Sequence, residues 1–177
     1  MQLLLTNQME GQMKNAVSYV SATLTALTVI LALVSTTAAA EKKTLTYYSK
    51  FGPVLSRTSA SPGDKPDHEI IQVTRQDMTT SPDPDWNDVP SLNYGQSDLI
   101  AGGGTVSGYA VRTHKNGDKT FYRYQGKIRP ISEGVKETAG EGTVELVGGT
   151  GKFANVKGSG TWNAAKGVST TKMDVEY

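Results

Sequence analysis

The 177-residue chain carries 18 Lys and Arg against 17 Asp and Glu, and the basic residues are spread along the sequence without forming a run. This distribution lacks the concentrated positive charge that nucleic acid or an anionic membrane surface requires, so we expect neither as a partner. The absence of cysteine excludes disulfides, thiolate metal sites and cysteine nucleophiles. The 19 glycines and 7 prolines, together with many Thr, Val and Tyr, favour strands and turns and predict an all-β protein.

Residues 1–40 have the organisation of a secretory signal peptide. Lys14 precedes the uncharged stretch 16–34, and three alanines follow, ending at Ala40. The strongest apolar core, about 11 residues long, is shorter than the roughly 20 that span a bilayer. We therefore predict cleavage after Ala40, export to the periplasm or the extracellular space, and no stable membrane anchor after cleavage. Met13 is an alternative start site, because an n-region rarely contains an acid such as Glu10.

Two strands are predicted early in the mature domain, residues 41–177. Residues 44–50 are rich in β-forming side chains, and the sequence Phe-Gly-Pro that follows ends or bends this strand. A second strand is expected at 68–79, between two proline-rich loops. One face of it carries Glu69, Ile71, Val73, Arg75 and Asp77. If that face points into a barrel, Glu69 or Arg75 is an interior charge and a candidate ligand-binding residue; otherwise both lie at the rims.

The strongest local signal is Asn116-Gly117, flanked by alternating residues on both sides. Asn-Gly is typical of a type I′ turn, which joins two strands through a two-residue loop. That register pairs Val111 with Tyr122 and Tyr109 with Tyr124. The predicted apolar face holds Tyr109, Val111, Tyr122 and Tyr124, and the opposite face holds Arg112, His114, Lys119 and Arg123 together with Phe121. His114 is accordingly expected to be solvated.

The C-terminal residues alternate between apolar and charged side chains. Met173, Val175 and Tyr177 share one face, and Lys172, Asp174 and Glu176 share the other. A half-buried strand here, with glycines suited to bends, predicts a sheet that closes on itself. About eight antiparallel strands use the mature length, so we predict a single closed antiparallel barrel. In it Tyr109, Tyr122, Tyr124 and Trp162 either line a ligand cavity or fill the core, and a filled core is the preferred interpretation.

Three segments resemble known barrel proteins. Residues 148–162, Gly-Gly-Thr-Gly-Lys-Phe-Ala-Asn-Val-Lys-Gly-Ser-Gly-Thr-Trp, resemble the turn and strand near the end of allene oxide cyclase-like barrels, a superfamily that also contains the plant dirigent proteins. Residues 83–87 and 114–122 resemble segments of small exported bacterial proteins with such a barrel. The resemblance implies calycin-like closure. The plant cyclases use a carboxylate in an apolar cavity, with a glutamate on the first strand and a cysteine contact. Residues 44–50 hold no acid and the chain has no cysteine, so no catalytic residue is carried over.

Polar clusters that resemble metal or phosphate sites each lack part of the motif. The glycine-rich turn at 148–152 lacks the first glycine and the Ser or Thr of a phosphate loop. The three aspartates within 83–88 lack the glycine and distal glutamate of a calcium hand. His68 and Glu69 are neighbours in a strand and point to opposite faces, so they do not converge on one atom as an acid and base pair would. We therefore expect no metal and no cofactor.

The sequence favours a non-enzymatic exported barrel that either holds a small apolar or aromatic molecule or acts as a structural and interaction module. The candidate ligand-binding residues are Tyr109, Tyr122, Tyr124, Trp162, Glu69 and Arg75. The alternative is a cofactor-free cyclase or isomerase, which needs a pocket that excludes water and a single carboxylate. A packed lumen would favour the structural module. No oligomeric state is predicted.

Overall fold

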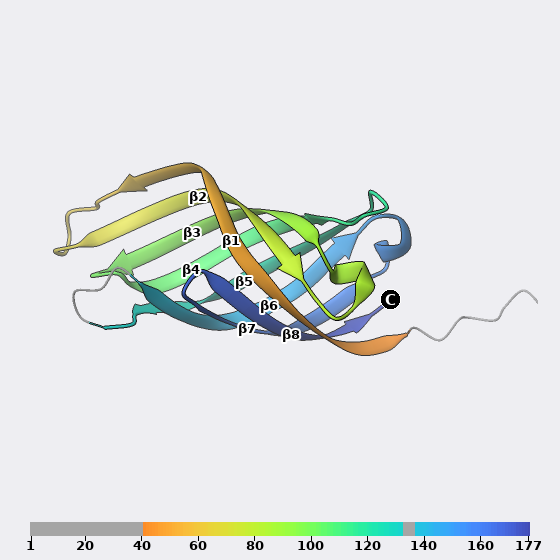
Figure 1. Cartoon of the computed structure of the whole chain (residues 1–177). Helices are drawn as coiled ribbons and strands as arrows, with labels where there is room; N and C mark the ends of the chain where they lie inside the picture. The colour runs from red at the N-terminus through yellow and green to blue at the C-terminus, as the bar shows by residue number, and fades with distance from the viewer. Residues whose placement is uncertain (1–40, 133–136) are drawn as a thin grey trace, which may run out of the picture. The chain divides into compact units, whose positions relative to one another are not determined.

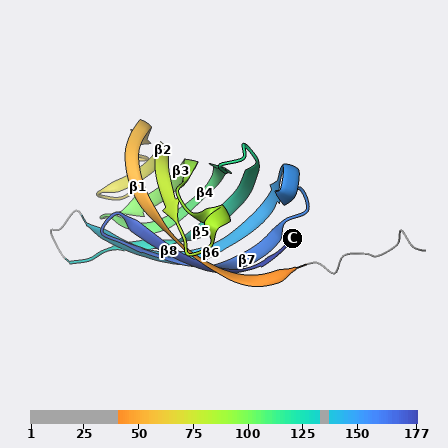
Figure 2. The ribbon, with the colours of Figure 1, turned by 45° about the vertical axis from the view of Figure 1, so that its right-hand side comes forward.

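The computed structural model describes residues 41–132 and 137–177, in which eight antiparallel strands form a closed barrel (Figure 1). The strands are β1 (Lys42–Ala60), β2 (His68–Thr80), β3 (Val89–Ile100), β4 (Gly103–Thr113), β5 (Lys119–Pro130), β6 (Thr138–Gly149), β7 (Lys157–Ala165) and β8 (Val168–Glu176). Each strand pairs with the next, and β8 pairs with β1 to close the ring (Figure 2). The predicted all-β closed barrel of eight antiparallel strands is confirmed. The predicted signal peptide lies outside the described residues.

β8 closes the barrel with the alternation that the sequence predicts. Met173 and Val175 are buried in the interior, while Lys172 and Asp174 are exposed. β8 is hydrogen-bonded to β7 along one edge and to β1 along the other, with Leu45 opposite Met173. Since both edges are paired, the last strand leaves no open edge in the ring. No helix among the described residues is long and apolar enough to cross a membrane.

The hairpin between β4 and β5 differs from the prediction by one residue. The Gly117 N–H donates to the His114 carbonyl at 2.9 Å and the His114 N–H donates to the Asp118 carbonyl at 2.8 Å, so the loop consists of residues 115–117. Gly117 has a φ of +87°, but Asn116 is not in the positive-φ region that a type I′ turn requires at both central positions. The predicted two-residue turn is therefore wrong, and the chain instead uses a three-residue loop with a left-handed glycine.

Two-residue loops with positive φ at both positions do occur elsewhere. Ala101 and Gly102, at +50° and +77°, join β3 to β4, and Lys166 and Gly167, at +51° and +77°, join β7 to β8. Both positions have positive φ, as in a type I′ turn, although neither sequence is the preferred Asn-Gly or Asp-Gly. The Asn-Gly dipeptide therefore located a hairpin correctly but not the length of its loop, and the two-residue loops carry other dipeptides.

The one-residue shift turns β4 over relative to β5. Tyr122 lies opposite Ala110 and Tyr124 lies opposite Gly108, rather than opposite Val111 and Tyr109. Because successive side chains point to opposite faces, Arg112 and His114 are buried inside the barrel. Tyr109 points outward and is 41% exposed. The predicted faces of β5 are correct and those of β4 are wrong.

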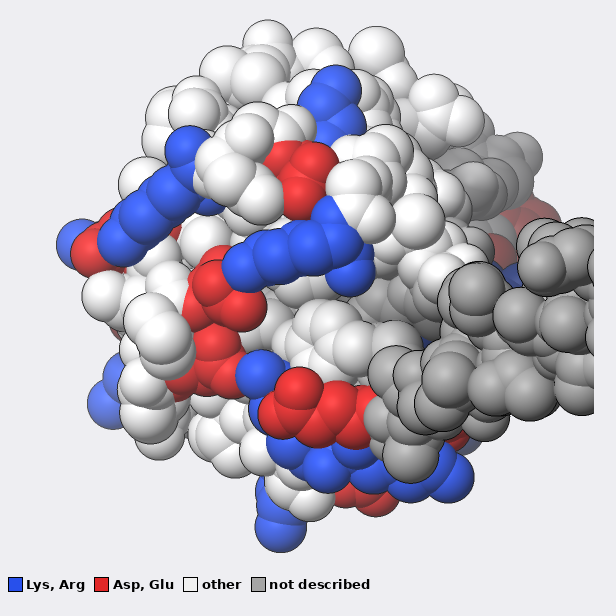
Figure 3. All heavy atoms as spheres, turned by 90° about the vertical axis from the view of Figure 1, so that its right-hand side faces the viewer, with Lys and Arg blue, Asp and Glu red and all other residues white. Residues whose placement is uncertain are grey.

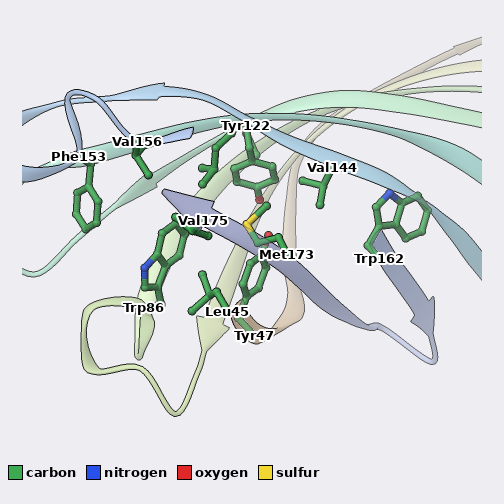
Figure 4. Close-up of a cluster of buried hydrophobic side chains, with 12 residues drawn as sticks. Leu45, Tyr47, Trp86, Tyr122, Val144, Phe153, Val156, Trp162, Met173 and Val175 are labelled. Atoms are coloured by element: carbon green, nitrogen blue, oxygen red, sulfur yellow. The ribbon is translucent and has the colours of Figure 1, made fainter. Parts of the chain in front are cut away.

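One end of the interior is filled, and we call it the packed end. Two short helical turns, η1 (Pro84–Trp86) and η2 (Gly151–Phe153), carry Trp86 and Phe153 inward, with their ring centroids 5.9 Å apart. The Trp86 Nε1 donates a hydrogen bond of 3.0 Å to the Tyr177 hydroxyl. Figure 4 shows these rings with the buried Leu45, Val156, Met173 and Val175, and the cluster continues along the lumen to Tyr47, Tyr122, Val144 and Trp162. Removing this apolar surface from water stabilises the packed end.

The outside of the packed end carries acidic and basic side chains next to one another (Figure 3). The three aspartates within 83–88 each lie near a lysine: Lys43 pairs with Asp83 at 2.6 Å, Lys152 with Asp85 at 2.5 Å and Lys115 with Asp88 at 3.8 Å. The Lys152 ammonium, by its hydrogen bond, lowers the pKa of Asp85. These pairs link the segment 83–88 to β1, to η2 and to the β4–β5 loop, and because the Asp85 and Asp88 pairs are exposed they contribute little to stability beside the buried rings.

Candidate functional site

A cavity of about 520 Å³ occupies the end of the lumen opposite η1 and η2, and we call this region the hollow end. All eight strands contribute to its lining. Glu137, Lys166 and Gly167 lie at its mouth, where β6 begins and β7 turns into β8, and Tyr47, Tyr122 and Arg112 lie at its inner end, next to the packed end. The preferred interpretation of a filled lumen is therefore wrong for this half of the barrel.

Two aromatic rings form the apolar wall of the cavity. Tyr124 of β5 and Trp162 of β7 meet edge to face, with centroids 6.3 Å apart. The Tyr124 hydroxyl donates to Asn93 Oδ1 at 2.9 Å, and the Trp162 Nε1 donates to the Thr143 carbonyl at 3.2 Å. Burial raises the pKa of Tyr124, so its hydroxyl stays neutral. With both polar edges satisfied, the rings offer apolar surface to a ligand.

Glycines give these rings their space. A Cβ at Gly108, directly across from Tyr124, would overlap the tyrosine ring. A Cβ at Gly142 would lie 2.8 Å from the Trp162 Nε1. A larger residue at position 108 would displace the Tyr124 ring, whereas one at position 142 would first overlap the Gln125 carbonyl oxygen, so Gly142 permits the close approach of β5 and Trp162 to β6.

Arg75 and Asp77 of β2 form an ion pair on the cavity wall. Arg75 and Asp77 are bidentate, with Nε to Oδ1 at 2.6 Å and Nη2 to Oδ2 at 3.1 Å. The Arg75 guanidinium also lies 3.8 Å from the centroid of the Phe51 ring, and the Gly52 N–H donates to Asp77 Oδ1 at 3.3 Å. Asp77 is only 4% exposed, so Arg75 supplies the opposite charge that a buried carboxylate needs.

A second arginine lies at the inner end of the cavity without an acidic partner. Arg112 is 1% exposed, and its guanidinium centre is 4.1 Å from the Tyr47 ring and 4.2 Å from the Tyr122 ring. Its Nε donates to Thr79 Oγ1 at 3.0 Å. No ion pair to Arg112 exists within residues 41–132 and 137–177. Burial raises the pKa of Tyr122 to about 12, although the charge of Arg112 opposes this, so the tyrosine remains a neutral hydroxyl.

Sequence reasoning missed Arg112 because the assumed hairpin register placed it on the solvent side. One signal could have corrected this register. The observed pairing sets the large Tyr122 and Tyr124 against the small Ala110 and Gly108. The assumed pairing crowds tyrosine against valine and tyrosine, so size complementarity across the two strands favours the observed register.

The two histidines lie at opposite ends of the barrel. At the packed end, His114 donates from Nδ1 to the Asp85 carbonyl at 2.8 Å, and its Nε2 lies 3.0 Å from Thr120 Oγ1, which must donate to it. Burial lowers the pKa of His114, and the prediction that it is solvated is wrong. At the hollow end, His68 lies between Asp64 at 2.5 Å and Asp98 at 2.9 Å, and its hydrogen bonds to them raise its pKa.

The structure places four of the six predicted ligand-binding residues on the cavity: Tyr122, Tyr124, Trp162 and Arg75. Tyr109 lies on the outer surface because of the hairpin register. Glu69 is exposed and pairs with Arg57 at 3.7 Å on the neighbouring strand, so it occupies the rim position that the sequence left open. Within the described ranges, no group of three or more His, Asp or Glu side chains is arranged to hold a metal ion.

No family model and no curated protein matches the sequence. Among solved structures, a pterocarpan synthase dirigent protein is 15% identical, with 81% of this chain and 92% of that chain covered and a TM-score of 0.46. Pyocyanin demethylase is also 15% identical, with 74% of this chain and 99% of that chain covered and a TM-score of 0.42. Membership of the allene oxide cyclase superfamily stays a prediction.

Proposed function

We propose that this protein binds a small aromatic or apolar molecule inside the hollow end of its barrel. The observation that carries the proposal is the cavity of about 520 Å³ that ends at a buried apolar cluster. Its volume lies within the roughly 300–1,000 Å³ of small-molecule sites. Its wall combines the rings of Tyr124 and Trp162 with the Arg75–Asp77 pair, a mixture of apolar area and a few fixed polar groups that suits one bound molecule.

The packed end supports this proposal because it closes one end of the lumen, so the cavity is preformed. Trp86 and Phe153 close the far end of the lumen and bring two connecting segments into one buried cluster. A site whose walls are already in place does not have to be ordered by the ligand, which lowers the cost of binding. The structural and interaction module receives less support, since such a role does not require an open lumen.

A cofactor-free cyclase or isomerase would use the same cavity and would need a carboxylate free to accept a proton. Asp77, the buried carboxylate among the described lining residues, already accepts hydrogen bonds from Arg75 and the Gly52 N–H. This arrangement favours a role as an anchor for Arg75 over a role as a base, and it supports binding over catalysis. The signal-like leader leads us to propose that binding takes place outside the cytoplasm.

The experiment is a fluorescence titration of the mature domain with the neutral probe phenylnaphthylamine. We expect a dissociation constant in the micromolar range, about −8 kcal/mol. Ala164→Trp should block the cavity and abolish binding, because Ala164 lines the lumen. Asn163→Trp is the matched control, since the neighbouring residue points outward and is exposed. Thermal unfolding should show that both variants are folded. The proposal would be contradicted if the parent protein did not bind the probe, or if folded Ala164→Trp bound it as tightly as the parent does.

A further inference from the structure

The interior of the barrel has an unbalanced positive charge. In the described part of the chain, the charged residues on the inner wall of the cavity are Arg75, Asp77 and Arg112. Asp77 is paired with Arg75, at 2.6 and 3.1 Å, and although the Asp77 charge also acts on Arg112, Arg112 has no ion pair of its own in the described residues. A buried charge without a partner is costly, so its retention calls for an explanation.

The protein meets only part of the hydrogen-bonding capacity of Arg112. Nε donates to Thr79, and the rings of Tyr47 and Tyr122 cover the two sides of the guanidinium. Ring faces attract the cation but do not accept the N–H groups that lie in the guanidinium plane. Nη1 is buried and has no hydrogen-bond partner in the described residues.

Two further polar atoms beside Arg112 are in the same condition. The Tyr47 hydroxyl and the Ser91 hydroxyl are buried without a hydrogen bond of good geometry in the described residues, although Tyr47 interacts with Arg112 and Ser91 with Tyr122. Ser91 lies directly opposite Arg112 on β3, and Tyr47 lies against the guanidinium. Poorly satisfied buried polar groups are rare in folded proteins, and three at one place call for a further partner, which is either water or a polar group of a ligand.

We propose that the ligand of the hollow end carries an acidic group, such as a carboxylate, sulfonate or phenolate, and that Arg112 and Tyr47 bind its anionic oxygen at the inner end of the cavity. This inference rests on the proposed binding function and specifies the class of ligand. One anionic oxygen accepts from both the guanidinium and the hydroxyl, and it neutralises the charge that the protein leaves unpaired. The apolar part of the molecule then extends along Tyr124 and Trp162 toward the mouth.

A competing source of attraction for anions is Lys166 at the mouth of the cavity. Lys166 is exposed, and the acidic Glu137 also lines the mouth. Dissolved salt weakens the attraction between exposed charges, most strongly beyond a Debye length, and affects buried pairs much less. An anion preference that comes from Arg112 therefore persists at high salt, whereas one that comes from Lys166 does not.

The test compares two probes with the same aromatic skeleton, anilinonaphthalene sulfonate and the neutral phenylnaphthylamine. We expect the sulfonate to bind the mature domain about tenfold more tightly, because hydrogen bonds to charged groups are among the strong ones. Most of this preference should remain in about 0.5 M salt. Arg112→Met should bring the affinities for the two probes to within about twofold of each other, since the substitution replaces a buried charge with an apolar chain, and the ratio of the two affinities separates this effect from a general change in binding.

Tyr47→Phe is a second variant that removes only the hydroxyl, and it should lower the preference for the sulfonate over the neutral probe about threefold. Lys166→Met and the outer-face variant Arg123→Met are controls that should keep the preference. If neither probe binds the parent protein, the proposed function itself fails. If both bind equally, or if Lys166→Met alone removes the preference, the binding function stands and the acidic ligand is wrong.

Discussion

At the packed end two connections carry a helical turn that folds inward, whereas at the hollow end two of the connections are two-residue turns. The segments 81–88 and 150–156 include η1 and η2, which deliver Trp86 and Phe153 into the lumen. The turns at 101–102 and 166–167 reverse the chain at once and contribute no large side chain to the interior. The strands thus form the wall of the barrel, and the two connections that fold inward with a buried aromatic ring fill one end of it.

The largest effect should follow from emptying the packed end. Trp86 is fully buried against Tyr47, His114 and Phe153, so Trp86→Ala should reduce the free energy of unfolding by about 3–5 kcal/mol in urea denaturation. Tyr109→Ala, which truncates a ring on the outer surface, is the control and should cost less than about 1 kcal/mol. Equal losses in the two variants would contradict the difference between the packed interior and the outer surface.

A smaller loss of stability is expected at the hollow end. Tyr124 borders the cavity on one side, so Tyr124→Ala removes fewer contacts than a fully packed ring would lose, and we expect a cost of about 1–2 kcal/mol. The same variant should lower the affinity for the neutral probe about tenfold, because the Tyr124 ring supplies apolar area to the site. Urea denaturation and probe titration of one preparation measure both effects. A loss as large as that of Trp86→Ala, without a change in probe binding, would mean that this end is also packed.

The smallest expected effect is a difference in pKa between the histidine at each end of the barrel. NMR titration should give a pKa below the ordinary histidine value for His114, because burial disfavours its charged form. The pKa of His68 should lie above that value, because Asp64 and Asp98 bind its protonated ring. The chain has only two histidines, so His68→Asn identifies the signals.

The two shifts have opposite consequences for stability. The contribution of neutral His114 is complete above its unfolded pKa and is lost as the pH falls through that value toward the folded pKa. The contribution of His68 is complete below its unfolded pKa and is lost as the pH rises through its raised folded pKa. Acidification from about pH 7 to about pH 5 should therefore destabilise His68→Asn more than the parent, as measured by the urea midpoint. A larger loss of stability in the parent than in His68→Asn would contradict the raised pKa of His68.

Several features of the fold followed from the sequence because they depend on short-range periodicity. The alternation in β8 placed Met173 and Val175 inside, and the alternation in β2 placed Arg75 and Asp77 on one face of the strand. β5 likewise turned Tyr122 and Tyr124 inward. A strand that is buried on one face must separate its side chains in this way, so no knowledge of distant residues is needed.

The site required the tertiary structure, because the register of β4 against β5 is not set by Asn116-Gly117 alone. Asp118 accepts the Lys152 N–H at 3.0 Å, and Thr150 Oγ1 accepts the Lys119 N–H at 2.8 Å, so the segment before and through η2 holds the start of β5. The burial of His114 between Trp86 and Phe153 then favours the three-residue loop. These contacts come from residues far along the chain, and a register shift of one residue exchanges the two faces of a strand.

The sequence by itself determined the all-β class, the number of strands and the closure of the barrel, because strand periodicity and turn residues are local properties. Tertiary structure decided that the lumen is filled at one end and open at the other, and that Arg112 lies inside it. Both outcomes depend on which connections fold inward and on a one-residue choice of register, and long-range packing settles these where local propensity permits more than one answer.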